Sequence, residues 1–309
     1  MERNDVKIII SGLDNAGKTS ILTALNKKYD FQKAIMELKP TIRIEYHKMS
    51  FLGNSVMLWD MGGQEKYRKV YQKRQEIYFD DTDLLLYIID IQDKERIEES
   101  LNYLDMVLQF FLKHDIDTPL IVSFHKFDPE IRGDEELNNR IEGLREKLLE
   151  KYPTIKILFQ QTSIYDLISI IQLISYGLSV FDEKFFDLSE LLEAYVDEFD
   201  CSSLILFDES GIIISEFYSD EIDPELYIKL LESIKEHLFL LKRMQEEKDT
   251  EHNFYNIEAN ILSYLHSFKI GEYHFFISVI IREELRENLL EIFSEFLEDV
   301  IKILNSVIT

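Results

Sequence analysis

Residues near the start of the chain have the composition and spacing of a phosphate-binding loop. Gly12–Thr19 reads GLDNAGKT, which matches G-x-x-x-x-G-K-[ST], and it lies between an apolar run and a helical pattern. Glycines let backbone N–H groups turn towards a phosphate, Lys18 can reach the β- and γ-phosphates, and the Thr19 hydroxyl can ligate Mg²⁺. The residues expected to contact the nucleotide here are Asp14, Asn15, Ala16, Gly17, Lys18, Thr19 and Ser20.

A second group of residues could complete a hydrolytic site. Residues 60–64 read DMGGQ and follow an apolar strand. A carboxylate at that strand end can hold the Mg²⁺ shell, the Gly63 N–H can bind a γ-phosphate, and Gln64 can orient the attacking water. Thr41, directly after Pro40, is a natural second hydroxyl ligand, although a strand threonine without a metal role is the alternative. The expected metal ligands are Thr19, Thr41 and Asp60, and the expected catalytic residues are Gln64 and Lys18.

The choice of base is attributed to residues 125–128, which read HKFD after the apolar run Leu120–Phe124. The Asp128 carboxylate can accept hydrogen bonds from the ring N–H and the exocyclic amine of guanine, a donor pair that adenine lacks. Residues 162–164, TSI, would close the base pocket with a backbone N–H, an assignment that depends on their position in the order. The expected base-site residues are His125, Lys126, Asp128, Ser163 and Ile164.

Apolar, β-rich runs alternate with helical patterns in the first half of the chain, which indicates an α/β domain with a mainly parallel sheet and helices on both faces. Two of the runs, Ile42–Leu52 and Ser55–Asp60, are joined by Gly53-Asn54, so an antiparallel hairpin is expected at the sheet edge. The other expected elements are strands at Val6–Ser11, Leu84–Asp90, Leu120–Phe124 and Ile155–Phe159, and helices at 18–28, 96–113, 135–151 and 164–180.

The second half predicts one antiparallel sheet covered on one face by helices. Two hairpins are expected, turned at 208–211 and 269–272. Because five elements with their own apolar faces follow a complete first domain, we expect two domains, 1–180 and 181–309. The expected helices are Leu188–Phe199, 224–246 and 283–306, and the expected strands are Ser203–Phe207, Ile212–Phe217, Asn256–Phe268 and Tyr273–Ile281.

Charge and cysteine content limit the classes of partner. Residues 1–180 hold 24 Lys and Arg against 29 Asp and Glu, whereas residues 181–309 hold 10 against 30, within a net charge of −25. Such acidity disfavours nucleic acid and anionic lipid as partners. Cys201 is a single cysteine, which is typical of a reducing compartment and predicts a cytoplasmic protein. A charged start with Glu2 and no apolar run of about 20 residues predict no direct membrane insertion, so that membrane contact would come through partners.

These motifs, in this order, resemble the Ras-like small GTPases and, within them, the Rag/Gtr family. The loop Gly12–Thr19 and the runs 40–42 and 59–66 are similar to the Arf branch, whereas 51–54, 58–60, 125–128 and 162–166 are similar to Rag proteins. Residues 206–208 fall in a region that resembles the Rag roadblock, or longin-like, module. The resemblance implies a P-loop GTPase domain followed by an α/β roadblock-like domain that pairs two subunits and offers a platform to regulatory proteins.

Two departures from the family patterns matter. Arg43 stands where an Arf has glycine, and His125 replaces the asparagine of the general N-K-x-D motif, as in Rag proteins, so that a contact bracing the phosphate loop is altered. The expected function is a slow GTP-to-GDP switch in which regions 36–48 and 62–75 close on the γ-phosphate. No arginine finger is evident in cis, and we interpret Arg43, Arg68 and Arg74 as solvated surface charges.

The expected ligands and partners are Mg²⁺, GTP or GDP, GTPase-activating or exchange proteins, and a homo- or heterodimer partner bound through the C-terminal domain. Two alternatives to this reading stay open. One is an Arf-like trafficking GTPase, and the other is a non-hydrolysing scaffold subunit that keeps its nucleotide as a structural element. Intact Gln64, Thr41 and Thr19 weigh against the scaffold.

Overall fold

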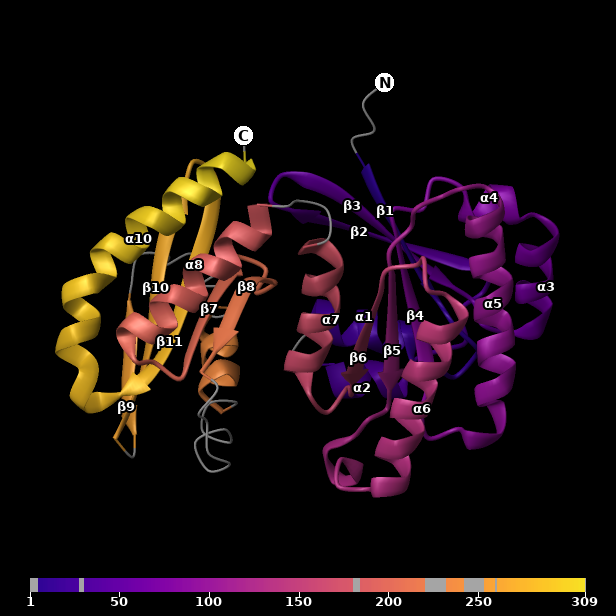
Figure 1. Cartoon of the computed structure of the whole chain (residues 1–309), viewed down its shortest axis with the longest axis horizontal. Helices are drawn as coiled ribbons and strands as arrows, with labels where there is room; N and C mark the ends of the chain where they lie inside the picture. The colour runs from indigo at the N-terminus through magenta and orange to yellow at the C-terminus, as the bar shows by residue number, and fades with distance from the viewer. Residues whose placement is uncertain are drawn as a thin grey trace. The chain divides into compact units, whose positions relative to one another are not determined.

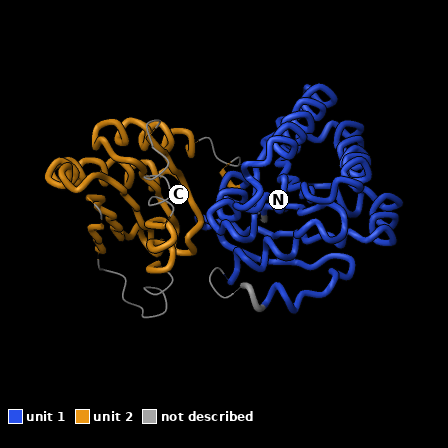
Figure 2. The backbone as a smooth tube through the Cα atoms, turned by 90° about the horizontal axis from the view of Figure 1, so that it is seen from below, with its two compact units in different colours: residues 1–177 blue, residues 178–309 orange. Residues whose placement is uncertain are grey.

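The computed structural model describes residues 5–27, 31–179, 184–219, 232–241, 253–258 and 260–308. The chain divides into two compact units, residues 1–177 and residues 178–309 (Figure 2). The boundary between the units falls inside helix α7 (Leu167–Ser179). Each unit has its own sheet and its own buried apolar residues, so the two are described separately.

Unit 1 is built on a six-stranded sheet in the order β2-β3-β1-β4-β5-β6 (Figure 1). All neighbouring strands are parallel except β2 and β3, which form an antiparallel hairpin at the edge. This confirms the predicted fold class, a mainly parallel sheet with one antiparallel edge strand. The strands are β1 (Asp5–Ser11), β2 (Ile44–Phe51), β3 (Asn54–Met61), β4 (Leu84–Asp90), β5 (Leu120–His125) and β6 (Ile157–Thr162).

Helices cover both faces of this sheet. Alternate residues of β4 face opposite ways: Leu85 belongs to one core cluster with Leu104 and Leu144 of two helices, whereas a Cβ added at Gly177 of α7 would lie 2.7 Å from the Leu84 side chain. The helices are α1 (Lys18–Lys27), α2 (Phe31–Met36), α3 (Glu65–Lys73), α4 (Gln75–Phe79), η1 (Lys94–Arg96), α5 (Ile97–Lys113), η2 (Pro129–Ile131), α6 (Glu135–Lys151) and α7.

The turn of the β2–β3 hairpin is Leu52-Gly53 and not the expected Gly53-Asn54. Phe51 pairs with Asn54 across the turn, and Leu52 and Gly53 have φ values of 45° and 81°. A two-residue hairpin turn with two positive φ angles has the twist that joins antiparallel strands, and glycine takes such an angle without strain. The sequence prediction was wrong by one residue because asparagine-glycine and glycine-asparagine pairs are the usual turn signals, and here leucine occupies the first position.

Unit 2 contains a five-stranded antiparallel sheet in the order β8-β7-β11-β10-β9. The predicted strand Asn256–Phe268 is in fact two strands, because Asn260 has a φ of 66° and the chain reverses there, so that Ile261 pairs with Glu258. The elements are α8 (Lys184–Phe199), β7 (Ser203–Asp208), β8 (Ile213–Tyr218), β9 (Phe254–Glu258), β10 (Ile261–Ile270), β11 (Tyr273–Arg282), η3 (Glu283–Leu285) and α10 (Arg286–Ile308).

Both faces of the second sheet carry helices, which corrects the expectation of one covered face. The ring of His266 on β10 packs on Phe293 of α10, with ring centroids 4.9 Å apart. Ser263, which faces the opposite way on the same strand, lies 2.7 Å from His237 of the helical segment 232–241. The rest of the expected helix 224–246 lies outside the described residues. β8 and β9 are the two edge strands, and each pairs with one neighbouring strand in the described part of the chain.

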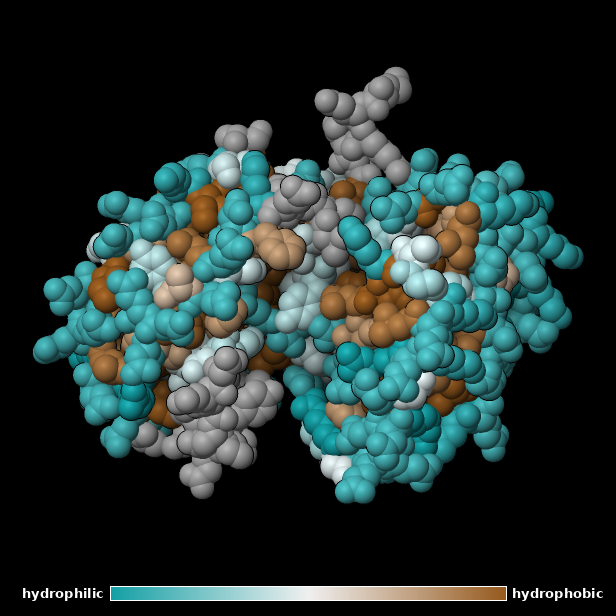
Figure 3. Space-filling model, in the orientation of Figure 1, coloured by the Kyte–Doolittle hydropathy of each residue, from teal (hydrophilic) through white to brown (hydrophobic). Residues whose placement is uncertain are grey.

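The surface in view is mainly hydrophilic, with separate hydrophobic groups on each unit (Figure 3). Isolated apolar residues at a surface are normal in a folded protein. Within the described part of the chain, no helix combines the length and the apolar character that a membrane span requires.

Candidate nucleotide-binding site

The phosphate loop joins the carboxyl end of β1 to the first turn of α1. Three of its residues, Gly12, Asn15 and Gly17, have positive φ angles of 143°, 61° and 99°. This geometry turns the loop back on itself and directs it at the N-terminus of a helix, where backbone N–H groups favour an anion. A cavity of about 280 Å³ lies against the loop and is lined by Asp14, Asn15, Gly17, Lys18, Thr19, Ser20, Leu38, Lys39, Pro40, Thr41, Gly63 and Gln64.

Lys18 points into the loop that carries it. Its side chain is 5% exposed, and its Nζ donates to the carbonyl oxygens of Gly12 at 3.0 Å and Leu13 at 2.6 Å. Burial lowers the pKa of Lys18 to about 8, although the carboxylates of Asp60 and Asp14 act in the opposite direction. An anion beside the ammonium group would stabilise its charged form and replace the carbonyl partners.

Three side-chain oxygens, the ones expected to organise Mg²⁺, converge next to this lysine. The Thr19 hydroxyl donates to Asp60 Oδ2 at 2.5 Å and lies 2.8 Å from the Thr41 hydroxyl, which is 3.3 Å from the same carboxylate oxygen. Burial raises the pKa of Asp60, and the two hydroxyl bonds partly offset the rise. Mg²⁺ prefers oxygen ligands at 2.0–2.1 Å in an octahedron, whose adjacent ligands are about 2.9 Å apart, so the two threonine hydroxyls have suitable spacing.

Gly63 and Gln64 bring the end of β3 against the phosphate loop. A Cβ added at Gly63 would lie 2.2 Å from the Leu13 carbonyl carbon and 2.2 Å from the Asp14 nitrogen, so only glycine fits there. Gln64 is the N-cap residue of α3 and makes no side-chain capping bond. Its side chain therefore stays available to the cavity that it lines.

His125 lies directly beneath the loop. A Cβ added at Gly17 would lie 2.4 Å from the ring of His125, whose Nδ1 is 2.8 Å from the hydroxyl of Thr162. The ring thus supports the loop by close packing, while its hydrogen bond goes to β6. Burial lowers the pKa of His125 to about 3, so the ring is neutral at physiological pH.

Asp128 lies between two side-chain donors. Ser163 Oγ donates to its Oδ1 at 2.5 Å, and Gln92 Nε2 donates to its Oδ2 at 3.0 Å. A carboxylate has about four lone-pair sites, so both oxygens can still accept from a base. Lys126, with a φ of 63°, is held by Asp90 through an ion pair of 2.6 Å. Gln92 was missed from the sequence, although its place just after β4, beside the end of β5, was an available signal.

The segment 162–164 lies beside Asp128, and the closing of a base pocket by one of its backbone N–H groups stays a prediction. The backbone N–H of Ser163 donates to Ser169 Oγ at 3.1 Å, and its hydroxyl holds Asp128. Ser163 therefore contributes to the base site through its side chain. Ile164, the next residue, is half-buried at the same end of β6.

Two arginines join the nucleotide site to Glu99 of α5, Arg96 through the phosphate loop and Arg68 through the end of β3. Arg96 Nη2 pairs with Asp14 Oδ1 at 2.6 Å, and the guanidinium lowers the pKa of that carboxyl against the opposing effect of burial. Arg68 donates to the Gly63 carbonyl at 2.8 Å and pairs with Glu99, which also accepts from Arg96.

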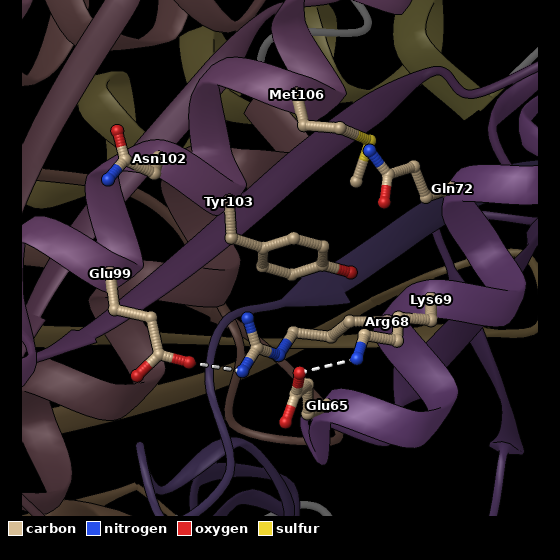
Figure 4. A pocket seen from close by; sticks show the side chains of 8 residues that line it. All are labelled: Glu65, Arg68, Lys69, Gln72, Glu99, Asn102, Tyr103 and Met106. Atoms are coloured by element: carbon tan, nitrogen blue, oxygen red, sulfur yellow. Dashed lines mark hydrogen bonds and ion pairs between the residues drawn. The ribbon is translucent and has the colours of Figure 1, made fainter.

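Arg68 is therefore not the solvated surface charge that we expected. Its side chain is 12% exposed, and its guanidinium carbon lies 5.3 Å from the Tyr103 ring centroid. Figure 4 shows the Arg68 side chain running beneath Tyr103 towards Glu99, in a cavity of about 460 Å³ between α3 and α5. Arg43 and Arg74 are exposed, as predicted.

The profile of the ADP-ribosylation factor family matches residues 1–166, more than half of the chain. The chain belongs to this family. Ras-related GTP-binding protein A of Dictyostelium discoideum is 29% identical over 188 residues, which are 57% of this chain and 62% of that protein. ADP-ribosylation factor-like protein 3 of Chlamydomonas reinhardtii is 35% identical over 127 residues, 41% of this chain and 66% of that protein.

The match thus spans slightly less than two thirds of the length of each of these relatives. A solved structure, the Arl6 (BBS3) small GTPase from Trypanosoma brucei with the bound nucleotide analogue GppNp, is 18% identical, with a TM-score of 0.41 and coverage of 57% of this chain and 96% of that one. The expected resemblance to a small GTPase with Arf-like and Rag-like features is confirmed, and a second α/β unit follows the matched region.

Proposed function

We propose that this protein is a Mg²⁺-dependent GTPase that binds guanine nucleotide, hydrolyses GTP slowly and acts as a molecular switch. The observation that carries the proposal is the convergence of Thr19, Thr41 and Asp60 oxygens beside Lys18, in a cavity that the phosphate loop and the segments 38–41 and 63–64 share. These segments come from three separate parts of the sequence. When the γ-phosphate is lost, the segments 38–41 and 63–64 would be released from the phosphate loop.

Each residue has a defined task in this proposal. Lys18 exchanges its loop carbonyls for the β- and γ-phosphates, and the backbone of Gly63 meets the γ-phosphate next to the loop on which it already packs. Thr19, Thr41 and Asp60 would hold Mg²⁺, which when bound neutralises charge on the phosphates. Gln64 orients water for attack on the γ-phosphorus.

Hydrolysis is expected to be slow because the cavity offers no arginine. None of its described lining residues is an arginine, and Arg68 and Arg96 are engaged with Glu99 and Asp14. A supplied arginine accelerates such reactions by about 10³–10⁵. An activating protein would therefore have to bring one.

Guanine selection is assigned to Asp128. Ser163 and Gln92 fix both of its oxygens in place, so that guanine can add two hydrogen bonds to an oriented carboxylate. Adenine lacks this donor pair and would leave the remaining lone pairs of the carboxylate without a donor from the base.

Unit 2 is proposed to be a roadblock or longin-like module that pairs with a second such subunit and receives regulators in the cytoplasm. Its five-stranded antiparallel sheet, with a strand at each edge, supports this role. Any membrane contact would come through partners.

The decisive experiment measures phosphate release from GTP under single-turnover conditions with and without Mg²⁺. Gln64→Leu should bind nucleotide normally and slow hydrolysis, whereas Gln72→Leu, an exposed glutamine on the same helix, should leave both unchanged. Equal rates in the Gln64 variant would move the water-orienting role elsewhere. No phosphate release by the unaltered protein would favour the non-hydrolysing scaffold.

A further inference from the structure

Three potential metal ligands lie together on one face of the β2–β3 hairpin. Glu45 pairs with Asp60 across the two strands, and His47 lies two residues further along β2, so all three side chains share a face. One ligand atom from each residue lies within 4.8 Å of the others. The alternate residues Tyr46 and Trp59 pack ring to ring, with centroids 5.0 Å apart, on the other face.

Two side-chain atoms of this group, His47 Nε2 and Asp60 Oδ1, are buried without a hydrogen-bond partner in the described part of the chain. Asp60 is 0% exposed, and its other oxygen, Oδ2, accepts the bonds from Thr19 and Thr41. The two oxygens thus serve different surroundings. A buried polar atom without a partner is costly, and two of them within one group of potential metal ligands point to a ligand that would satisfy both.

We propose that His47 Nε2, Asp60 Oδ1 and the Glu45 carboxylate bind a divalent transition cation of the Zn²⁺ type. An imidazole with two carboxylates is a donor set that Zn²⁺ and Co²⁺ accept, and three protein ligands leave a fourth position for water. Mg²⁺ is disfavoured because it prefers oxygen ligands in an octahedron. Ligands at about 2.0–2.2 Å from a tetrahedral cation are roughly 3.4 Å apart. The ligand atoms lie within 4.8 Å of one another without a cation, and the exposed Glu45 side chain can turn towards the other two ligands.

Asp60 belongs both to the proposed hairpin site and to the nucleotide site. Its Oδ2 accepts from the hydroxyls of the expected Mg²⁺ site, whereas its Oδ1 has no partner among the described residues, so a cation on the hairpin draws on the carboxylate that serves the nucleotide site. The cation would also fasten the edge strand β2 to β3. The geometry of the hairpin site itself does not depend on the proposed GTPase activity.

The test is a Co²⁺ titration of the full chain without nucleotide, in excess Mg²⁺, followed by visible absorption. Excess Mg²⁺ competes with Co²⁺ for the all-oxygen site, and tetrahedral Co²⁺ bands report the nitrogen-containing one. We expect one Co²⁺ per chain, displaced by one Zn²⁺. His47→Ala should weaken Co²⁺ binding by at least about 100-fold, since even the loss of an outer-shell partner costs roughly 10–100-fold.

His114→Ala is the matched control, because this histidine is exposed at the end of α5 and bonds only locally, to the Phe110 carbonyl at 2.9 Å. It should bind Co²⁺ as the unaltered chain does. Circular dichroism checks that the His47 variant is folded; if it is not, Glu45→Gln, an exposed change, must weaken binding, and histidine ¹⁵N spectra of the unaltered chain must show Zn²⁺ at His47 Nε2. Absent tetrahedral bands, or bands that persist with equal affinity without His47, would overturn the proposal.

Discussion

Lys18 and Asp60 are buried residues of opposite charge, and their hydrogen-bond partners differ. The Lys18 ammonium group donates to the backbone carbonyls of its own loop, whereas Asp60 already accepts from two threonine hydroxyls. The carboxylate is thus organised without nucleotide, while the ammonium group gains its strongest partner only from a phosphate. This asymmetry separates residues that shape the site from those that supply its affinity.

Replacing Lys18 by alanine should therefore weaken GTP binding by roughly 100-fold, about 3 kcal/mol, because charge-assisted hydrogen bonds to the phosphates are lost. Fluorescent-nucleotide titration measures the change. Lys69→Ala, which removes an exposed lysine paired with Glu65 on the same helix face, should leave the affinity unchanged. Equal affinities in the two variants would contradict the role of Lys18.

Asp128 offers a test of base choice. Asp128→Asn should lower GTP affinity by roughly 10- to 100-fold and raise affinity for xanthosine triphosphate, because the amide donates where the carboxylate accepted and xanthine has a carbonyl there. Competition between GTP, ATP and XTP measures the preference, with the exposed Asp117→Asn as the control. If ATP competes as well as GTP for the unaltered chain, the assignment of Asp128 is wrong.

Among the contacts between secondary-structure elements, the one between the end of β3 and the phosphate loop is especially close. It depends on the missing side chain at Gly63, since a Cβ there would lie 2.2 Å from Leu13 and Asp14 backbone atoms. A backbone cannot yield as a flexible side chain does. The loop and the start of α3 must therefore separate if any other residue stands at this position.

Gly63→Ala should slow GTP hydrolysis by at least about tenfold, because it moves the backbone that is to meet the γ-phosphate. Gly143→Ala, in the middle of α6 where nothing lies within 4 Å of an added Cβ, should instead raise the free energy of unfolding by about 1 kcal/mol without affecting hydrolysis. Phosphate release and urea unfolding of both variants separate the two effects. Normal hydrolysis by the Gly63 variant would show that the close contact is not used in the reaction.

Long apolar elements were predictable and short irregular ones were not. β4 reads LLLYIID and α5 has apolar residues at helical spacing, so each is recognisable from its own sequence. The short helices α2, α3 and α4 were not predicted, because each has too few turns for a helical repeat of apolar residues to be recognised. The break between β9 and β10 escaped because Asn260 interrupts a run that otherwise favours strand.

Residues whose type and spacing a motif fixes, such as Thr19 and Asp60, could be expected to meet, and the two are hydrogen-bonded. Partners that come from elsewhere in the chain could not be predicted, because Arg68 and Arg96 reach Gly63 and Asp14 only through the packing of α3 and α5. Gln92 belongs to the same class. The direction of a side chain in such contacts is set by the tertiary structure, which a single sequence does not reveal.

At the scale of the whole molecule, both units contain a buried neutral histidine. Burial lowers the pKa of His125 in unit 1 and of His237 in unit 2 to about 3, whereas an unfolded histidine titrates near 6.5. Between these pH values the unfolded chain binds more protons than the folded chain. The contribution of the two neutral histidines to the free energy of unfolding is therefore fully present above about pH 6.5 and decreases as the pH is lowered through this window.

Denaturant unfolding should accordingly show a lower midpoint at about pH 5 than at about pH 7. His237→Gln should reduce this dependence for unit 2 while lowering stability at neutral pH, because Ser263 and Ser278 lose their common partner. The exposed His114→Gln should retain the full dependence. An unchanged midpoint between the two pH values would exclude neutral buried histidines in the folded state.

Unit 2 poses the question of how a strongly acidic domain could pair with another subunit. Helices cover both faces of its sheet, so the edges β8 and β9 are the parts that another chain could extend. Residues 181–309 hold 30 acidic against 10 basic residues, and two copies brought edge to edge would repel each other. A less acidic partner is therefore favoured over a homodimer.

The prediction is that residues 178–309 fold alone and form a heterodimer with a less acidic roadblock-type domain, with self-association appearing only as salt screens the repulsion. A second core, with Leu192, Phe207 and Phe296 buried, supports independent folding. Circular dichroism tests folding, and mass measurement at low and high salt, with and without the partner, tests pairing. An unfolded fragment would contradict the domain division, and a folded fragment that stays monomeric with every such partner would contradict pairing while leaving the nucleotide site untouched.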